Sequence, residues 1–115
     1  MKILFLGDIV GPSGCMVVEK YLKKIVEENK INFVIANGEN AAHNGVGITK
    51  DVLDNLIKFG VNVLTTGNHV WDHKETLKLV EDDKRLLRPF NLIGISPGKG
   101  FEIYQTSKNF KIGVL

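Results

Sequence analysis

Cysteine is nearly absent from this sequence. Cys15 is the only one in 115 residues, so no disulfide can form within the chain. Because disulfides persist mainly in oxidising compartments, we expect a cytoplasmic protein. Long apolar runs are missing too: the N-terminal run ends at Asp8, which is too early for a signal-peptide core or a membrane span. We therefore expect no membrane partner.

An excess of charge of one sign is also missing. The 15 lysines and arginines nearly balance the 13 aspartates and glutamates, which leaves a net charge of +2. The lysines are spread along the expected helices, so we expect no strong nucleic-acid-binding patch. The hydrophobic share of 43% suits a folded domain. Repeats, low-complexity tracts and linkers are absent as well, so residues 1–115 are expected to form a single domain.

The apolar pattern alternates between expected strands and expected helices. Strands are predicted at Ile3–Leu6, Phe33–Ala36 and Val61–Leu64. The first two are uniformly apolar, and the first is expected to be buried on both faces. Helices are predicted at Met16–Asn29 after a turn at 11–14, from an N-cap at Thr49 to Gly60, and near Lys74–Glu81. This order predicts an α/β fold whose sheet has a parallel core.

The pattern changes after Pro89. We expect a short strand at Asn91–Ile95, a turn at 97–100, and strands at Phe101–Gln105 and Phe110–Leu115 joined by a turn at 107–109. Such a hairpin would make the sheet mixed. The chain stops inside the last apolar strand without a turn or a cap, so we expect the domain to be incomplete in these 115 residues.

Three polar clusters follow the three predicted parallel strands. Asp8 follows the first strand, Glu39 and Asn40 follow the second, and Asn68 and His69 follow the third. Since ligands bind at the carboxyl ends of parallel strands, these side chains are expected on one rim of the sheet. Carboxylate and amide oxygens together with an imidazole suit manganese, iron, zinc or magnesium.

Each cluster has an ordinary structural explanation when it is taken alone. Asp8 could cap the following helix, Glu39 could be a solvated turn residue, and Asn40 could be a left-handed turn residue. Asn68 and His69 could belong to a surface loop. The coincidence of three such clusters in consecutive units favours a common site.

Two-metal hydrolysis of a phosphate ester is a chemistry that would use these residues. A shared carboxylate can bridge two cations, which activate a water between them. Glu39 is the predicted bridge, with Asp8 and Asn40 on one metal and Asn68 on the other. His69 would protonate the leaving alkoxide, because imidazole titrates near neutral pH.

Other residues near these clusters leave alternatives open. Asp72 could orient the histidine, but we favour it as the cap of the next helix. His43 could contact the phosphate, although a role in shaping its loop is favoured, and His73 is expected to be solvated. Trp71 is expected to pack under the loop rather than stack on a base. Arg88 either lines the site or pairs with the acidic run at 81–83.

Together these motifs resemble the bacterial YmdB-like metallophosphoesterases of the calcineurin-like superfamily. The likeness rests on Gly-Asp-Ile-Val-Gly from position 7, Asn-Gly-Glu-Asn-Ala-Ala-His from position 37 and Gly-Asn-His-Val-Trp-Asp from position 67, and it continues through the whole chain. It implies an α/β/β/α sandwich of which residues 1–115 form the N-terminal half. It implies two metal ions, iron or manganese ahead of zinc or magnesium, with Asp8, Glu39, Asn40 and Asn68 as ligands and His69 as the proton donor. It also implies hydrolysis of 2′,3′- or 3′,5′-cyclic nucleotides, and we expect a homo-oligomer.

Two departures from the family pattern bear on this expectation. Family members are much longer and draw further histidine ligands from their second half, whereas no histidine follows His73 here. Cys15 stands where the family commonly has an arginine, and we favour a small residue at a helix start over a reactive thiol. The alternative function is therefore a non-catalytic module that binds a nucleotide or a metal. A flavodoxin-like or Rossmann-like binder ranks last, because residues 7–14 lack Gly-x-Gly-x-x-Gly.

Overall fold

Four parallel strands form the central sheet of the computed structural model, which describes residues 1–92, 97–106 and 109–115. The strands are β1 (Ile3–Leu6), β2 (Phe33–Asn37), β3 (Val63–Thr65) and β4 (Leu86–Leu87), and they lie in the order β1-β2-β3-β4. All three neighbouring pairs are parallel. The predicted parallel core is therefore confirmed, and all the carboxyl strand ends lie on one rim. The pattern did not predict β4, which has only two residues.

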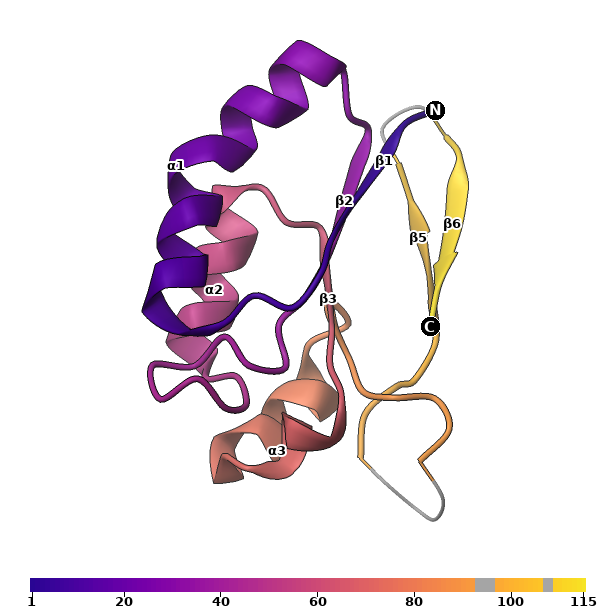
Figure 1. Ribbon diagram of the computed structural model, residues 1–115. Coiled ribbons are helices and arrows are strands. Elements are labelled where there is room, and N and C mark those ends of the chain that lie inside the picture. Colours follow the sequence, from indigo (N-terminus) through magenta and orange to yellow (C-terminus); the bar gives the residue numbers. More distant parts are fainter. Residues whose placement is uncertain (93–96, 107–108) are drawn as a thin grey trace.

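Three α-helices cover one face of this sheet (Figure 1). They are α1 (Gly11–Asn29), α2 (Lys50–Phe59) and α3 (Lys74–Asp82). The expected turn at 11–14 was wrong, because these residues form the first turn of α1. Proline is tolerated there, since its missing N–H has no partner within the helix. No helix among the described residues is long and apolar enough to cross a membrane.

An antiparallel hairpin lies on the opposite face of the sheet (Figure 1). Its strands are β5 (Glu102–Gln105) and β6 (Lys111–Val114), which confirms the predicted hairpin. In the described residues the two strands form a sheet of their own, so they are a second layer rather than an antiparallel edge of the first sheet. Parts of the strand expected at Asn91–Ile95 and of the turn expected at 107–109 lie outside the described residues.

The core is split by the alternation of side chains along the strands. Val34, Ala36 and Leu64 belong to the cluster under the helices. Phe33 and Val63 belong to a second cluster that includes residues of the hairpin. The central strands are thus buried on both faces, as uniformly apolar strands should be.

The edge strand β1 differs from its neighbours. Ile3 is 44% exposed and Phe5 is 60% exposed, so the expectation that this strand is buried on both faces was wrong. Neither residue belongs to the cluster that the hairpin covers. A uniformly apolar run does not distinguish an edge strand from a central one, because both can carry the same residues.

Candidate metal centre

Backbone hydrogen bonds hold the three predicted loops together at the carboxyl rim. The N–H of Ile9 donates to the carbonyl of Asn37 at 3.0 Å, and the N–H of Gly38 donates to that of Thr65 at 2.9 Å. The N–H of Gly11 donates to Asn40 O at 2.9 Å. The sheet pairing therefore continues beyond the strand ends, and it fixes the backbone that carries the predicted ligands.

Asp8 and Asn40 contact each other directly. The side-chain Nδ2 of Asn40 donates to Asp8 Oδ1 at 2.9 Å. Asp8 does not cap α1, because Val10 occupies the N-cap position and no side chain bonds to the helix start. With Nδ2 committed to Asp8, the amide oxygen of Asn40 is the atom available to a ligand.

Glu39 is the most unusual residue of the rim. Its Oε2 atom is buried and has no hydrogen-bond partner among the described residues. It also lies against Gly67, where an added Cβ would sit 1.8 Å from Oε2. The solvated-turn explanation of Glu39 was therefore wrong. A buried carboxylate oxygen without a partner is costly, so the position calls for a proton donor or a cation.

The third loop forms the short 3₁₀ helix η1 (Asn68–Trp71), which places Asn68 one residue beyond Gly67. Asn68 is exposed at the rim, and His69 is half-buried. The Nδ1 atom of His69 lies 2.6 Å from Asp72 Oδ2. The expectation that Asp72 caps α3 was wrong, because His73 occupies that position and Asp72 turns to His69 instead.

The contact between Asp72 and His69 sets the chemistry of the imidazole. Because Nδ1 faces the Asp72 carboxylate, the ring is oriented and Nε2 is the ring nitrogen left to face a ligand. The spacing of three residues was the sequence signal for this pair. It was outweighed by the frequency of aspartate at helix N-caps.

Two side chains from the start of α3 fix the loop that follows Glu39. The Nε2 atom of His73 lies 2.9 Å from Val46 O, and the buried hydroxyl of Thr76 donates to Ile48 O at 2.7 Å. The expectation that His73 is solvated was wrong, since it is half-buried by this contact. The pattern gave no indication of Thr76, whose role depends on a partner 28 residues away.

The remaining residues near the rim have structural roles. The exposed side chain of His43 lies 3.4 Å from Asp51, in the first turn of the helix α2 that follows the same loop. This contact is in keeping with the favoured role of His43 in shaping the loop. Trp71 packs against the core cluster under the helices, as predicted. The thiol of Cys15 contacts Ala41 O at 3.6 Å, and burial raises its pKa. A raised pKa is opposite to what a reactive thiol needs.

A parallel sheet with helices on one face, a β-hairpin on the other and polar loops at one rim is the fold of a metallophosphoesterase. A family model described as "YmdB-like protein" matches residues 4–115, so the chain belongs to the YmdB-like family. The chain is similar to a 2′,3′-cyclic-nucleotide 2′-phosphodiesterase of Bacillus subtilis, with 45% identity over 100 residues. That match spans 87% of this chain and 38% of the relative.

Two crystal structures share this fold. A hypothetical protein from Thermus thermophilus superimposes with a TM-score of 0.88 at 36% identity, covering 98% of this chain and 43% of the other. A phosphatase from Mycoplasma pneumoniae superimposes with a TM-score of 0.88 at 33% identity, covering 98% and 41%. The predicted family and fold class are confirmed. The chain spans less than half the length of each of these proteins.

Proposed function

We propose that this chain forms part of a metal-dependent phosphodiesterase whose metals sit on the carboxyl rim of the parallel sheet. The observation that carries the proposal is the buried Oε2 atom of Glu39, which has no partner among the described residues. A divalent or trivalent cation supplies the missing partner without adding a donor group to a crowded site. The phosphodiesterase and phosphatase names of the similar proteins support the same class of reaction.

The donor set on the rim fits such metals. Carboxylate oxygens of Asp8 and Glu39 and amide oxygens of Asn40 and Asn68 are hard ligands. We assign Glu39 as the bridging ligand, Asp8 and Asn40 to one metal, and Asn68 to the other. When bound, the metals supply positive charge to the phosphoryl oxygens and to the attacking water. Iron or manganese is favoured over zinc or magnesium.

His69 acts as the proton donor in this proposal. Its Nε2 atom gives a proton to the oxygen of the leaving group, and the carboxylate of Asp72, 2.6 Å from Nδ1, holds the ring in position. Asp72 is thus a positioning residue, because it acts through His69 and touches no reacting atom.

The substrate we propose is a small phosphate ester, namely a 2′,3′- or 3′,5′-cyclic nucleotide. The name of the Bacillus subtilis relative supports the 2′,3′-cyclic class. The cytoplasmic location and the homo-oligomeric state remain predictions. Light scattering on the purified protein tests the second of them.

Hydrolysis of bis-p-nitrophenyl phosphate tests the activity most simply. The purified intact protein is expected to turn over this diester when Mn²⁺ or Fe²⁺ is added, and to turn over 2′,3′-cyclic AMP as well. Chelation by EDTA should abolish both activities. The absence of turnover above the metal-free control, with several metals tried, would contradict the proposal.

The second candidate function is a binding module that holds a nucleotide or a single metal without turnover. It is favoured by one observation: the described residues contain no group of three or more His, Cys, Asp or Glu side chains that could hold a metal. Metal analysis by mass spectrometry distinguishes the two candidates. Two tightly bound metals per chain support the enzyme, whereas one metal without turnover supports the module.

A further inference from the structure

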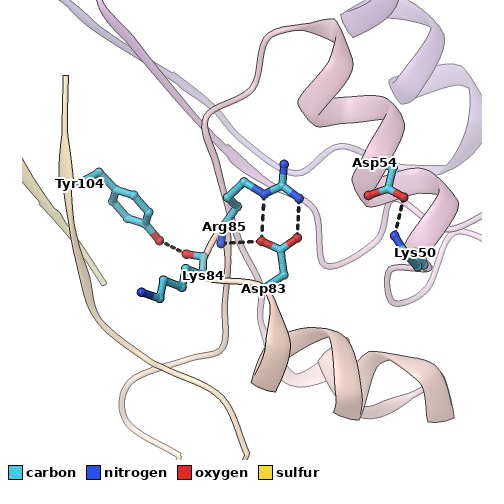
Figure 2. A network of polar contacts seen from close by, with 6 residues as sticks. All are labelled: Lys50, Asp54, Asp83, Lys84, Arg85 and Tyr104. Atoms are coloured by element: carbon cyan, nitrogen blue, oxygen red, sulfur yellow. Dashed lines mark hydrogen bonds and ion pairs between the residues drawn. The ribbon is translucent and has the colours of Figure 1, made fainter. Parts of the chain in front are cut away.

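The chain contains two arginines, Arg85 and Arg88, and their surroundings differ. The Nε and Nη2 atoms of Arg85 donate to the two carboxylate oxygens of Asp83 at 2.9 and 2.6 Å (Figure 2). Hydrogen bonding from Arg85 holds the pKa of the Asp83 carboxyl below its usual value. The guanidinium of Arg85 therefore forms an ion pair with Asp83 within the fold.

Arg88 has no such partner. Its Nη1 atom donates to the carbonyl of Pro89 at 2.8 Å. Its Nε atom is buried without a hydrogen-bond partner among the described residues. Among the described residues Arg88 forms no ion pair with the acidic run at 81–83, and Asp83 of that run pairs with Arg85 instead. Among the described residues, the Nε atom of Arg88 therefore has no carboxylate partner, whereas the Nε atom of Arg85 donates to Asp83.

The backbone of Arg88 lies at the carboxyl end of β4, on the same rim as the proposed metal ligands. It follows β4, whose last residue, Leu87, accepts hydrogen bonds from the backbone and hydroxyl of Thr66 at 3.0 and 2.8 Å. The next residue after Thr66 is Gly67, which lies against the Glu39 carboxylate. Arg88 therefore emerges beside the loop that carries Gly67.

The surroundings of Arg88 also fix its position. Its backbone N–H donates to Lys99 O at 3.0 Å. Gly100 packs so closely that an added Cβ would lie 3.0 Å from Arg88 Nη1 and 2.6 Å from Phe90 Cα. A guanidinium held in this way loses little conformational freedom when it binds a ligand.

We propose that Arg88 binds the phosphate group of the substrate through its Nε and Nη2 atoms, a role that rests on the proposed phosphodiesterase function. A guanidinium presents two parallel N–H donors that match two oxygens of a phosphate. Such a contact would give the buried Nε its missing partner and would hold the phosphate at the carboxyl rim. Arg88 then acts in binding and orientation and takes no part in proton transfer.

Calorimetric titration with inorganic phosphate tests this proposal independently of turnover. It is performed on the intact protein, once with Mn²⁺ and once with EDTA, at constant ionic strength. We expect Arg88→Gln to raise the Kd for phosphate about tenfold or more, the usual size for a charge-assisted bidentate contact. The matched control Arg85→Gln should bind phosphate like the wild type, because that guanidinium is occupied by Asp83.

Arg88→Lys provides a second variant in case the glutamine variant does not fold, which circular dichroism reports. The lysine keeps the charge but cannot place two parallel donors, so a weakening of several-fold is expected. Unchanged phosphate affinity in both folded Arg88 variants would overturn the proposal. So would a wild-type protein that binds no phosphate with either Mn²⁺ or EDTA.

The titration also distinguishes a failure of the proposed Arg88 phosphate contact from a failure of the proposed phosphodiesterase activity. If the wild type hydrolyses no ester but the Arg88 variants bind phosphate more weakly than it does, the phosphate site is supported and the proposed hydrolysis is contradicted. If hydrolysis proceeds and the Arg88 variants keep the wild-type KM and phosphate affinity, the enzyme stands and Arg88 has no role in binding. A supporting result raises KM in Arg88→Gln more than it lowers kcat.

Discussion

Glu39 and Asp83 are both partly buried carboxylates, but the protein treats them in opposite ways. Asp83 accepts two side-chain hydrogen bonds from Arg85 and one from its backbone, all within 2.9 Å. Glu39 keeps a buried oxygen with no partner among the described residues. A buried carboxylate needs a partner. Arg85 is the partner of Asp83, and we propose that a metal is the partner of Glu39.

The region around Asp83 serves to join layers of the fold. Asp83 is the C-cap residue that follows α3, and Arg85 comes just before β4. The hydroxyl of Tyr104, on the hairpin strand β5, donates to the carbonyl of Lys84 between them (Figure 2). Burial raises the pKa of Tyr104 to about 12, so the hydroxyl stays protonated at neutral pH. Asp83 thus has a structural role, whereas we propose that Glu39 binds a ligand.

Glu39→Gln is expected to have the largest effect on function. Loss of the proposed bridging carboxylate should lower turnover by at least about 100-fold, because both metals lose a charged ligand. The melting temperature without metal should not fall, since Oε2 of Glu39 is buried and has no hydrogen-bond partner to lose among the described residues. Asp83→Asn is the matched control: turnover at 25 °C should stay near the wild-type value. Equal turnover losses in the two variants would remove the distinction between the two carboxylates.

His69→Gln should come next in size. Loss of a general acid typically lowers kcat by about 10² to 10⁴. Asp72→Asn should lower kcat less, roughly tenfold, because the imidazole remains but its orientation is weakened. Steady-state kinetics should show a lower kcat in Asp72→Asn, with KM near the wild-type value and an unchanged affinity for metal. A wild-type kcat in that variant would contradict the orienting role.

Gly67→Ala should disturb the site by a steric clash, without changing any charge. The new methyl group would overlap the Glu39 carboxylate at 1.8 Å and push it aside. A displacement of that order can lower the rate about 100-fold. Gly7→Ala is the matched control at the same rim, because nothing lies within 4 Å of its added Cβ. Similar Mn²⁺ affinities in the two variants, measured by calorimetry, would show that Glu39 is not confined as described.

Arg85→Gln should have the smallest effect, and it should act on stability. Loss of this partly exposed pair is expected to cost about 1 kcal/mol in the free energy of unfolding. Because the folded pKa of Asp83 lies below the 3.8 of the free group, the pair's contribution is present above pH 3.8 and is lost as pH falls through the folded pKa. Urea denaturation at several acidic pH values measures this. An unchanged pH dependence in Arg85→Gln would contradict the assignment.

The sequence pattern predicted the parallel core and the location of the rim because both depend on local periodicity. Strands of uniformly apolar residues and polar clusters after them are visible without a structure. The exposure of Phe5 was missed because it depends on which strand lies at the edge of the sheet. The beginning of α1 was missed because glycine and proline at 11–14 suggested a turn, although proline is favoured in a first helical turn.

Site details that depend on distant partners could not be predicted. The isolation of Glu39 Oε2 follows from how Gly67 closes against it, and the two residues are far apart in the sequence. The difference between Arg85 and Arg88 has the same origin, since the pattern alone allowed Arg88 to pair with the acidic run.

Titration with Mn²⁺ of the wild type, Glu39→Gln and Asp83→Asn tests the central claim most directly. If Glu39 completes a metal site and Asp83 belongs to the fold, calorimetry should show tight binding in the wild type and in Asp83→Asn. Binding should be lost or weakened by at least about 100-fold in Glu39→Gln. Wild-type affinity and stoichiometry in Glu39→Gln would contradict the account, because the buried oxygen would then hold no metal.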